Sequence, residues 1–256
     1  MNETSRLGMD SRGVSDAVGY ILLLGVVFIS ITSVVILAGP LITEQQEEEY
    51  VSNTVHAFEI FDKNIKSIER ERSPSRATEM KYQGGTLFED SSLFLQVNVT
   101  HDGTTTSAVM ASTPVTYRKG GSAIHYEMGS VIREDHGNNV MRTDPPFTFT
   151  DDQVRMSMVT TTVTDDPLQL GRSGKVVLLS QEQGTTTRSF VQGDNPDDVE
   201  VELTVESPRY ELWRDYFKSQ GLTVDSVDHS RNSVQLSFTT KEFMLRETLV
   251  RVESQN

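Results

Sequence analysis

Five histidines are the side chains of this sequence best suited to bind a metal ion or to move a proton near neutral pH. No two of them stand at metal-ligand spacing, and there is neither a His-Glu-x-x-His motif nor a nucleophile elbow. The five are His56, His101, His125, His136 and His229. Cysteine is absent, which excludes disulfides, thiolate metal sites and thiol nucleophiles. We therefore expect no catalytic residue, no metal site and no cofactor, and we do not expect an enzyme.

Two further patterns contain groups that can hold an ion, and each has a simpler interpretation. Residues 171–175 read Gly-Arg-Ser-Gly-Lys, but this run lacks the spacing and the following Ser or Thr of a phosphate-binding loop. We interpret it as a turn between strands. Asp194, Asp197 and Asp198 offer oxygen ligands for a hard cation, but a solvated acidic loop is the favoured interpretation. A membrane-anchored enzyme is therefore less favoured than either of two non-enzymatic functions, a subunit of a surface assembly or a membrane-anchored surface protein.

The residues around position 13 suit proteolytic processing. Arg12, Gly13, Val14 and Ser15 place a cation and a small residue directly before a long uncharged run. A cut between Gly13 and Val14 would leave the following apolar helix on the mature chain. Ordinary signal-peptidase cleavage is disfavoured, because the apolar run exceeds the roughly 7–15 residues of a secretory signal core. The end of the run, at residues 37–40, also lacks a clean small-x-small cleavage site.

A membrane-spanning helix is predicted over residues 18–42. No charged residue occurs in residues 17–43, and Val, Ile, Leu and Phe dominate the run. At about 1.5 Å per residue this helix is long enough to cross a hydrocarbon layer of about 30 Å. Arg6 and Arg12 precede it, whereas four glutamates follow within residues 44–49. Because basic flanks stay in the cytoplasm, we expect a cytoplasmic N-terminus and an extracellular main domain.

This N-terminal pattern resembles the class III signal of archaeal type IV pilins and archaellins. It is most similar to haloarchaeal pilin-like proteins, whose mature chains begin with Val-Ser and a Gly-punctuated apolar helix. The residues that carry the resemblance are Arg12, Gly13, Val14, Ser15, Val18, Gly19 and the apolar run from Ile21 onward. The resemblance implies that a membrane prepilin peptidase cuts between Gly13 and Val14. It also implies that the helix from Val18 associates with other copies or with other pilin-like subunits.

Asp16 and Val18 depart from the pilin pattern. Asp16 stands where haloarchaeal adhesion pilins frequently have Pro, and Val18 stands where bacterial pilins typically carry Glu. Ser15 and Asp16 have two interpretations. Their oxygens can cap the first turn of the helix, where a negative charge is favourable. Alternatively, Asp16 pairs with the new amino terminus of Val14 on a neighbouring subunit during assembly.

Four regions follow from the composition. Residues 1–13 form a cytoplasmic leader, 14–43 a transmembrane or assembly helix, 44–73 an amphipathic stalk helix, and 74–256 an extracellular β-rich head. Gly39 and Pro40 are expected to kink or interrupt the helix. Apolar residues at three- and four-residue steps predict one buried face of the stalk, which packs on this chain's own head rather than on another subunit. They are Val51, Val55, Phe58, Phe61 or Ile65, and Ile68.

The head is predicted to be an antiparallel β-sandwich-like domain with a C-terminal helix and hairpin, so that the whole chain is α+β. A helix is expected near 207–220, begun by Ser207 and Pro208. Trp213 and Phe217 are interpreted as core anchors, with a carbohydrate-binding platform as the alternative. The region from Glu206 onward also resembles the C-terminal part of haloarchaeal pilin-like proteins, which mostly lack an assigned biochemical function. The predicted strands are 93–99, 109–117, 123–126, 147–150, 154–163, 175–180, 199–205, 222–227 and 233–239.

The charge of the chain limits its partners. With 37 acidic and 23 basic residues, the net charge is -14. Such a surface repels nucleic acid, so we expect none as a partner. The dispersed acidic residues suit high salt, and a halophilic archaeon is the expected source. Asn98 begins an Asn-Val-Thr sequon, which makes it a possible glycosylation site on the outer side.

The leading hypothesis is a pilin-like subunit of a cell-surface type IV pilus-like assembly, with a structural or adhesive role. Its partners would be the membrane, a prepilin peptidase and other subunits. The alternative is a bitopic membrane-anchored surface protein, with a binding or envelope-structural role, that does not form filaments.

Overall fold

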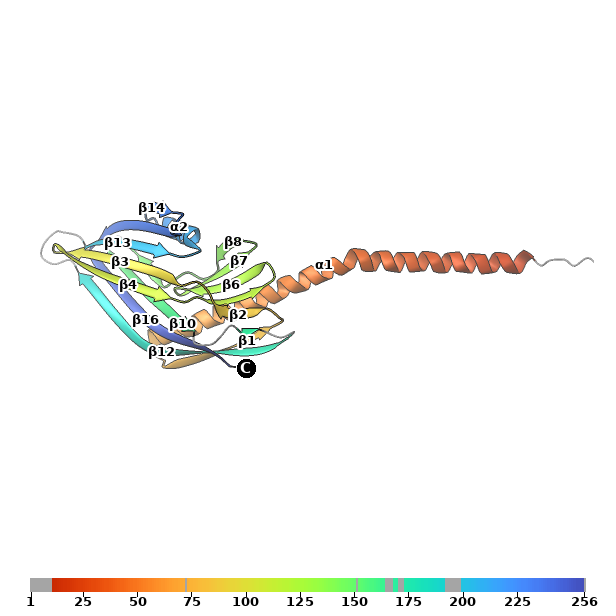
Figure 1. Ribbon diagram of the computed structural model, residues 1–256, viewed down its shortest axis with the longest axis horizontal. Helices are drawn as coiled ribbons and strands as arrows, with labels where there is room; N and C mark the ends of the chain where they lie inside the picture. Colours follow the sequence, from red (N-terminus) through yellow and green to blue (C-terminus); the bar gives the residue numbers. More distant parts are fainter. Residues whose placement is uncertain are drawn as a thin grey trace, which may run out of the picture. The chain divides into compact units, whose positions relative to one another are not determined.

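The computed structural model describes residues 11–71, 73–150, 152–163, 168–169, 173–191 and 199–255. Side chains of residues 11–16, 37–47, 71 and 168–169 lie outside this description. The chain is α+β and mostly strands, with an N-terminal apolar helix followed by a β-rich domain (Figure 1). It divides into two compact units, Met1–Glu49 and Tyr50–Asn256, which are described separately below.

The first unit holds the N-terminal part of helix α1, which runs from Ser11 to Glu71. Its segment Ala17–Ile36 is long and apolar enough to cross a membrane, and none of that segment is buried. Ser30 and Ser33 return their hydroxyls to the backbone oxygens of Val26 and Ile29, at 2.8 and 2.7 Å. These bonds satisfy two hydroxyls that would otherwise oppose a hydrocarbon environment.

Helix α1 is continuous at Gly39 and Pro40, where the sequence predicts a kink or an interruption. The prediction of an interruption is wrong. A proline removes one backbone hydrogen bond and crowds the preceding turn, but a long helix can continue through one such loss.

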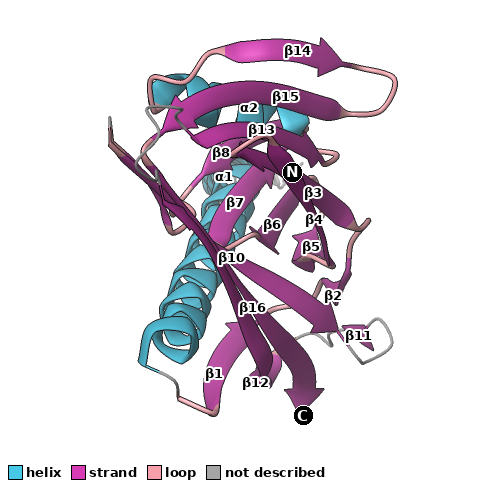
Figure 2. Ribbon diagram, turned by 90° about the vertical axis from the view of Figure 1, so that its left-hand side faces the viewer, coloured by secondary structure: helices cyan, strands magenta, loops and turns pink. Residues whose placement is uncertain are grey.

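In the second unit, α1 buries one face. Every apolar residue of the predicted stripe is buried, including both alternatives at Phe61 and Ile65. Val55, Phe58, Phe61 and Ile65 pack with side chains of two sheets, so the stripe packs on this chain's own domain, as predicted. Figure 2 shows this part of α1 beside the strands. Ile60, on the opposite face, is 52% exposed. Spacing at three and four residues therefore places the whole stripe on one side of the helix.

The described strands form three sheets. The first contains, in order, β1 (Ser75–Tyr82), β12 (Gly174–Val191), β16 (Glu242–Gln255), β10 (Gln153–Val163) and β9 (Phe147–Phe149). The second contains β11 (Leu168–Gln169), β2 (Thr86–Glu89), β5 (Val115–Lys119), β6 (Ser122–Glu127), β7 (Ser130–Asp135) and β8 (Asn138–Met141). The third contains β14 (Val224–Asp228), β15 (Ser233–Thr240), β13 (Val199–Glu206), β3 (Leu93–His101) and β4 (Thr104–Ser112).

Two hydrophobic clusters hold these layers together. One joins α1 to the first and second sheets around Phe58, Phe61 and Tyr126. The other joins the third sheet to β10, β16 and helix α2 (Tyr210–Ser219) around Trp213 and Phe217. Strands β10 and β16 contribute side chains to both clusters, because successive residues of a strand point to opposite faces. Trp213 and Phe217 are core anchors, as predicted, and both are fully buried.

The predicted antiparallel sandwich is found only in part. Strand β10 pairs in parallel with β16 over the whole length of β10, whereas the other described pairings are antiparallel. The predicted strand 109–117 is two strands, β4 and β5, separated at Thr113 and Pro114. Proline cannot donate to a sheet ladder, so the chain changes sheets there. Helix α2 begins at Tyr210 rather than near Ser207.

Candidate functional site

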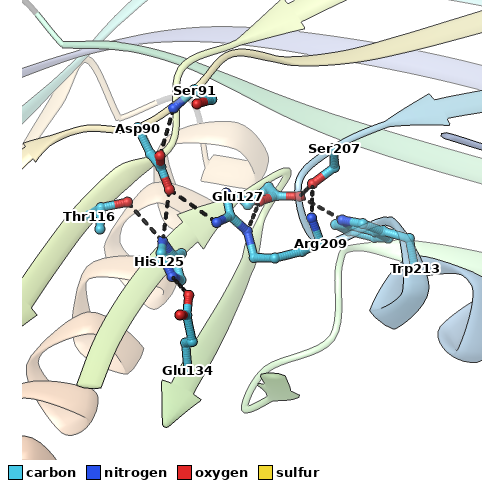
Figure 3. Close-up of polar contacts among 9 residues, drawn as sticks. All are labelled: Asp90, Ser91, Thr116, His125, Glu127, Glu134, Ser207, Arg209 and Trp213. Atoms are coloured by element: carbon cyan, nitrogen blue, oxygen red, sulfur yellow. Dashed lines mark hydrogen bonds and ion pairs between the residues drawn. The ribbon is translucent and has the colours of Figure 1, made fainter. Parts of the chain in front are cut away.

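The densest polar cluster of the described residues is a buried network built around Glu127, at the end of β6 (Figure 3). The carboxylate of Glu127 accepts hydrogen bonds from Ser207 Oγ at 2.8 Å, Trp213 Nε1 at 2.6 Å and Arg209 Nε at 2.5 Å. Ser207 and Arg209 lie just before α2, and Trp213 lies within it. We call the set the Glu127 network; its members are Asp90, Thr116, His125, Glu127, Glu134, Ser207, Arg209 and Trp213.

The backbone beside Glu127 is a tight turn that enters the core. Met128 and Gly129 both have positive φ angles, 50° and 78°, as a two-residue hairpin turn of type I′ requires. A Cβ atom on Gly129 would lie 2.6 Å from Cδ of Pro146, so only glycine fits. Met128 itself is fully buried. The turn between β6 and β7 therefore carries Glu127 into the core, where α2 can reach it.

Arg209 connects the turn to a second carboxylate. Its guanidinium contacts Glu127 through Nε and Asp90 through Nη1, the latter at 3.0 Å. Asp90 follows β2 and accepts the backbone N–H of Ser91 at 2.7 Å. A guanidinium offers several donors in a fixed plane, so one arginine can satisfy two acceptors from separate segments. The second sheet is thereby linked to the start of α2.

His125 extends the network along β6. Its Nδ1 lies 2.9 Å from Thr116 Oγ1 and 3.3 Å from Asp90 Oδ2, and its Nε2 lies 3.1 Å from Glu134 Oε2. The ring is fully buried, but Glu134 is partly exposed. Both ring nitrogens thus contact oxygen atoms of neighbouring side chains, so His125 joins β5, β7 and the residue after β2.

The charges of the network reinforce one another. Burial alone would raise the pKa of Asp90, but hydrogen bonds from His125 and Ser91 and the charge of Arg209 hold that pKa well below its ordinary value. Burial alone would lower the pKa of Arg209, but Glu127 and Asp90 raise it. The ionised forms of Asp90 and Arg209 are therefore favoured, and the Glu127 network acts as a buried clamp between the second sheet and the start of α2. One of its donor atoms, Arg209 Nη2, is buried without a hydrogen-bond partner among the described residues.

A second buried polar group lies on α1. Asp62 pairs with Lys66 Nζ at 2.8 Å, and Glu69 lies 3.4 Å from Arg246 Nη1 on β16. Burial raises the pKa of Asp62, only partly offset by Lys66. Burial, together with the charges of Asp62 and Glu69, raises the pKa of Tyr126. This group fastens α1 to the β-rich domain, and Asp62 Oδ1, Glu69 Oε2 and the Tyr126 hydroxyl are buried in it without a hydrogen-bond partner among the described residues.

The residues predicted for processing lie at the start of α1. Arg12, Gly13, Val14, Ser15 and Asp16 belong to the helix by backbone, and their side chains lie outside the described residues. Neither the cleavage nor the two interpretations of Ser15 and Asp16 is tested, and all remain predictions.

Asn98, the predicted glycosylation residue, lies inside strand β3 between β13 and β4. Its Nδ2 donates to Glu202 Oε2 at 3.3 Å, and its Oδ1 accepts from Gln96 at 3.3 Å. The acceptor nitrogen is therefore engaged once the sheet has formed. Its modification remains a prediction.

The other candidate ion-binding residues do not converge. Gly174 and Lys175 begin β12, and Lys175 pairs with Glu79 at 2.8 Å. Asp194, Asp197 and Asp198 lie outside the described residues. Within the part of the chain that is described, no group of three or more His, Asp or Glu side chains is arranged to hold a metal ion.

Most of the Glu127 network is not predicted from the sequence. His125 is one of the five candidate histidines and Trp213 is a predicted core anchor, but no motif singles out Asp90, Glu127 or Arg209. Glu127 and Arg209 are 82 residues apart, so no short motif joins them. No local pattern indicates that Glu127 is buried. It stands directly before the turn at Met128 and Gly129, where a carboxylate would be expected to face solvent.

The fold and the site define a class: a chain with one apolar helix able to cross a membrane, followed by a β-rich domain that is held by buried ion pairs. The chain belongs to a family of unknown function, DUF7289, whose model matches residues 12–253. No curated protein and no solved structure matches this chain. The family description names neither pilins nor archaellins, so a pilin-like role is a proposal for this chain.

Proposed function

We propose that this protein is a pilin-like subunit of a cell-surface type IV pilus-like assembly, with a structural or adhesive role. The observation that carries the proposal is helix α1. It combines an apolar, exposed segment, Ala17–Ile36, with a later segment whose single apolar face is buried in the β-rich domain. The first segment needs a hydrophobic environment, because a 20-residue helix made mostly of apolar side chains is strongly unfavourable in water.

The proposed orientation places the N-terminus in the cytoplasm and the β-rich head outside, in a haloarchaeal membrane. It rests on the basic residues before the helix and the glutamates after it. In the proposal, a prepilin peptidase removes residues 1–13 by cutting after Gly13. The apolar segment then either stays in the bilayer or becomes the core of an assembly, since both environments bury it.

The β-rich domain suits a structural role. Its buried ion pairs join separate segments of the chain, and its fully buried aromatic residues pack in two clusters. This extensive internal packing supports a structural or adhesive head.

The test is the mass of the mature N-terminus. We expect the full chain, isolated from membranes of a haloarchaeal host, to begin at Val14. A Gly13→Val variant should retain residues 1–13, because a branched side chain would replace the small residue at the cut. The matched control is Gly8→Val, which changes the leader but not the junction and should still be cleaved. An uncleaved wild-type chain would overturn the proposal.

The alternative function is a bitopic surface protein with a binding or envelope-structural role that does not form filaments. Asp16 and Val18, which depart from the pilin pattern, favour it. Mechanical shearing of cells separates the two functions. Filaments in the sheared fraction that contain this chain support the pilin-like subunit, whereas a chain recovered only in detergent extracts supports the alternative.

A further inference from the structure

Strand β4 is an exposed sheet edge with an unusual composition. It is the last strand of the third sheet, and its nine residues read Thr-Thr-Thr-Ser-Ala-Val-Met-Ala-Ser. It has no charged residue, no proline and no bulge in its pairing with β3. Proteins usually protect an edge of this length with a charge, a proline or a bulge, because its unpaired N–H and C=O groups invite another strand. Here all three forms of protection are missing.

The other described edges are protected or short. β14, at the opposite edge of the same sheet, carries Asp225 and Asp228. β1 carries charged side chains along its length, and Asn64 of α1 bonds to its Thr78. β8, β9 and β11 have four residues or fewer. Among the described edge strands of five or more residues, β4 alone is uncharged.

The free part of β4 is residues 104–111. At its end, Ser112 and the adjacent Thr113 bond to Thr161 of β10, so that end is already covered. Residues 104–107 are exposed on both faces of the strand. Further along, Val109 is 65% exposed, and Ala111 pairs with Phe94, which is also exposed. No strand among the described residues pairs with this side of β4, so the edge combines open backbone groups with a small apolar surface.

We propose that β4 pairs antiparallel with β4 of a second copy of this chain, which joins two third sheets edge to edge. This contact deepens the self-association in the proposed function. It rests on that function for one premise, that copies of the chain meet on the same membrane. We choose a second copy of the chain as the partner of β4. The β4 strand of that copy is also uncharged, so no register of the pair places a charged side chain of one β4 opposite the other. Like charges directly opposite each other in a strand pair are destabilising.

The distribution of acidic residues supports this choice of edge. On the outer face of the sheet, Glu200 and Glu202 lie on β13, which β3 separates from β4. With strands about 4.8 Å apart, the two β13 strands of a joined pair would be about 24 Å from each other. That exceeds the screening length of about 8 Å at physiological salt. Pairing through β14 would instead bring Asp225 and Asp228 of two copies to within a strand spacing.

The absence of cysteine gives a direct test. Thr105, Ser107, Val109 and Ala111 are each replaced by Cys in the full chain, one at a time, and membranes of the expressing cells are treated with a short bis-maleimide. Such a reagent tolerates the diagonal separation of about 7–8 Å in an antiparallel pair. The matched control is Ser226→Cys, an exposed position on β14. We expect cross-linked dimers about tenfold more abundant from β4 than from the control, because only the paired edge holds the thiols together.

A charge variant makes the test specific. In the Ser107→Cys chain, Val109→Lys should reduce cross-linking several-fold, because it places two like charges in the pair. Thr239→Lys, on an exposed position of the inner strand β15, should leave it unchanged. Unaltered fluorescence of Trp213, the single tryptophan, shows that each variant is folded. Equal cross-linking at Ser226, none at any β4 position, or none lost with Val109→Lys would overturn the proposal.

The two proposals fail in distinguishable ways. A chain that retains residues 1–13 but cross-links through β4 refutes the pilin-like subunit and keeps the β4 contact. A chain that begins at Val14 and is found in sheared filaments, but does not cross-link through β4, supports the pilin-like subunit and refutes the β4 contact.

Discussion

At the scale of single residues, Glu127 is the centre of the buried polar network of the β-rich domain. Its carboxylate is fully buried and accepts hydrogen bonds from Ser207 and Arg209, which precede α2, and from Trp213 within α2. A buried carboxylate is strongly unfavourable unless charge and hydrogen bonds compensate for its lost hydration. Here Arg209 supplies the charge, and Ser207 and Trp213 complete the hydrogen bonding. The site is therefore sensitive to the loss of any one partner.

Replacing Glu127 with Gln tests this arrangement. The variant keeps the shape of the side chain but leaves the buried Arg209 with Asp90 as its remaining close counter-ion. We expect the free energy of unfolding to fall by about 3 kcal/mol, at the low end of the range for a broken buried ion pair. Urea unfolding of the full chain in non-ionic detergent, followed by Trp213 fluorescence, measures it. Glu200→Gln, an exposed change on β13, should alter stability by less than about 0.5 kcal/mol. Similar effects of the two changes would contradict the clamp.

Asp90 should give the domain a specific dependence on acid. Its pKa is lowered in the fold, so as pH falls the unfolded chain binds a proton before the folded chain does. The stability that ionised Asp90 contributes is present above its ordinary pKa of about 3.9 and is lost as pH falls below that value. We expect the stability difference between wild type and Asp90→Asn to narrow between pH about 4 and about 2. A difference that stays constant over this range would contradict the assignment.

At the scale of elements, helix α1 has two distinct segments with different surroundings. Ala17–Ile36 is apolar on all sides and unburied in its unit. From Tyr50 onward, one face is buried against the sheets and the other is exposed. A change on the buried face should therefore affect the stability of the β-rich domain, whereas a change on the exposed face of the same helix should not.

Phe61 and Ile60 are adjacent in sequence and provide that comparison. Phe61 is fully buried and meets the ring of Tyr126 edge to face, with centroids 5.0 Å apart. We expect Phe61→Ala to reduce the free energy of unfolding by about 3–5 kcal/mol, because it leaves a cavity between two sheets. Ile60→Ala should cost less than about 1 kcal/mol. The same urea unfolding series measures both. Equal losses would mean that this face of α1 is not part of the domain core.

Strand β3 explains why the context of a sequon matters. Asn98 has a ladder partner on each side, Glu202 on β13 and Ser107 on β4. An enzyme that needs an extended, accessible acceptor would find one before the third sheet forms rather than afterwards. The position of Asn98 in strand β3, rather than the three-residue motif, therefore determines when a glycosylating enzyme can reach its side chain.

At the scale of the whole molecule, charge and edges act together. A net charge of -14 opposes close approach of two copies unless their contact surfaces are uncharged or the salt concentration is high. The free part of β4 is such a surface, and a shared membrane would raise the local concentration of copies. The N-terminal mass and the β4 cross-linking described above test assembly at this scale.

Local patterns in the sequence predicted much of the fold. The uncharged run at residues 17–43 and the apolar stripe from Val51 to Ile68 determine the two segments of α1, because both depend on neighbours within a few turns. Most predicted strands exist for the same reason, since alternation and turn residues act locally. The strand predicted over 109–117 fails where Pro114 separates β4 from β5.

The sequence by itself therefore determined the membrane-length helix, the amphipathic face that follows it, the abundance of strands and the absence of thiol chemistry. Only the tertiary structure decided the three sheets, the parallel pairing of β10 with β16, the Glu127 network and the exposure of β4. Each of these joins segments far apart in the chain: Glu127 and Arg209 meet across 82 residues, and β10 and β16 across nearly ninety. Such contacts depend on which surfaces remain unburied once local elements have formed, and no local pattern encodes that outcome.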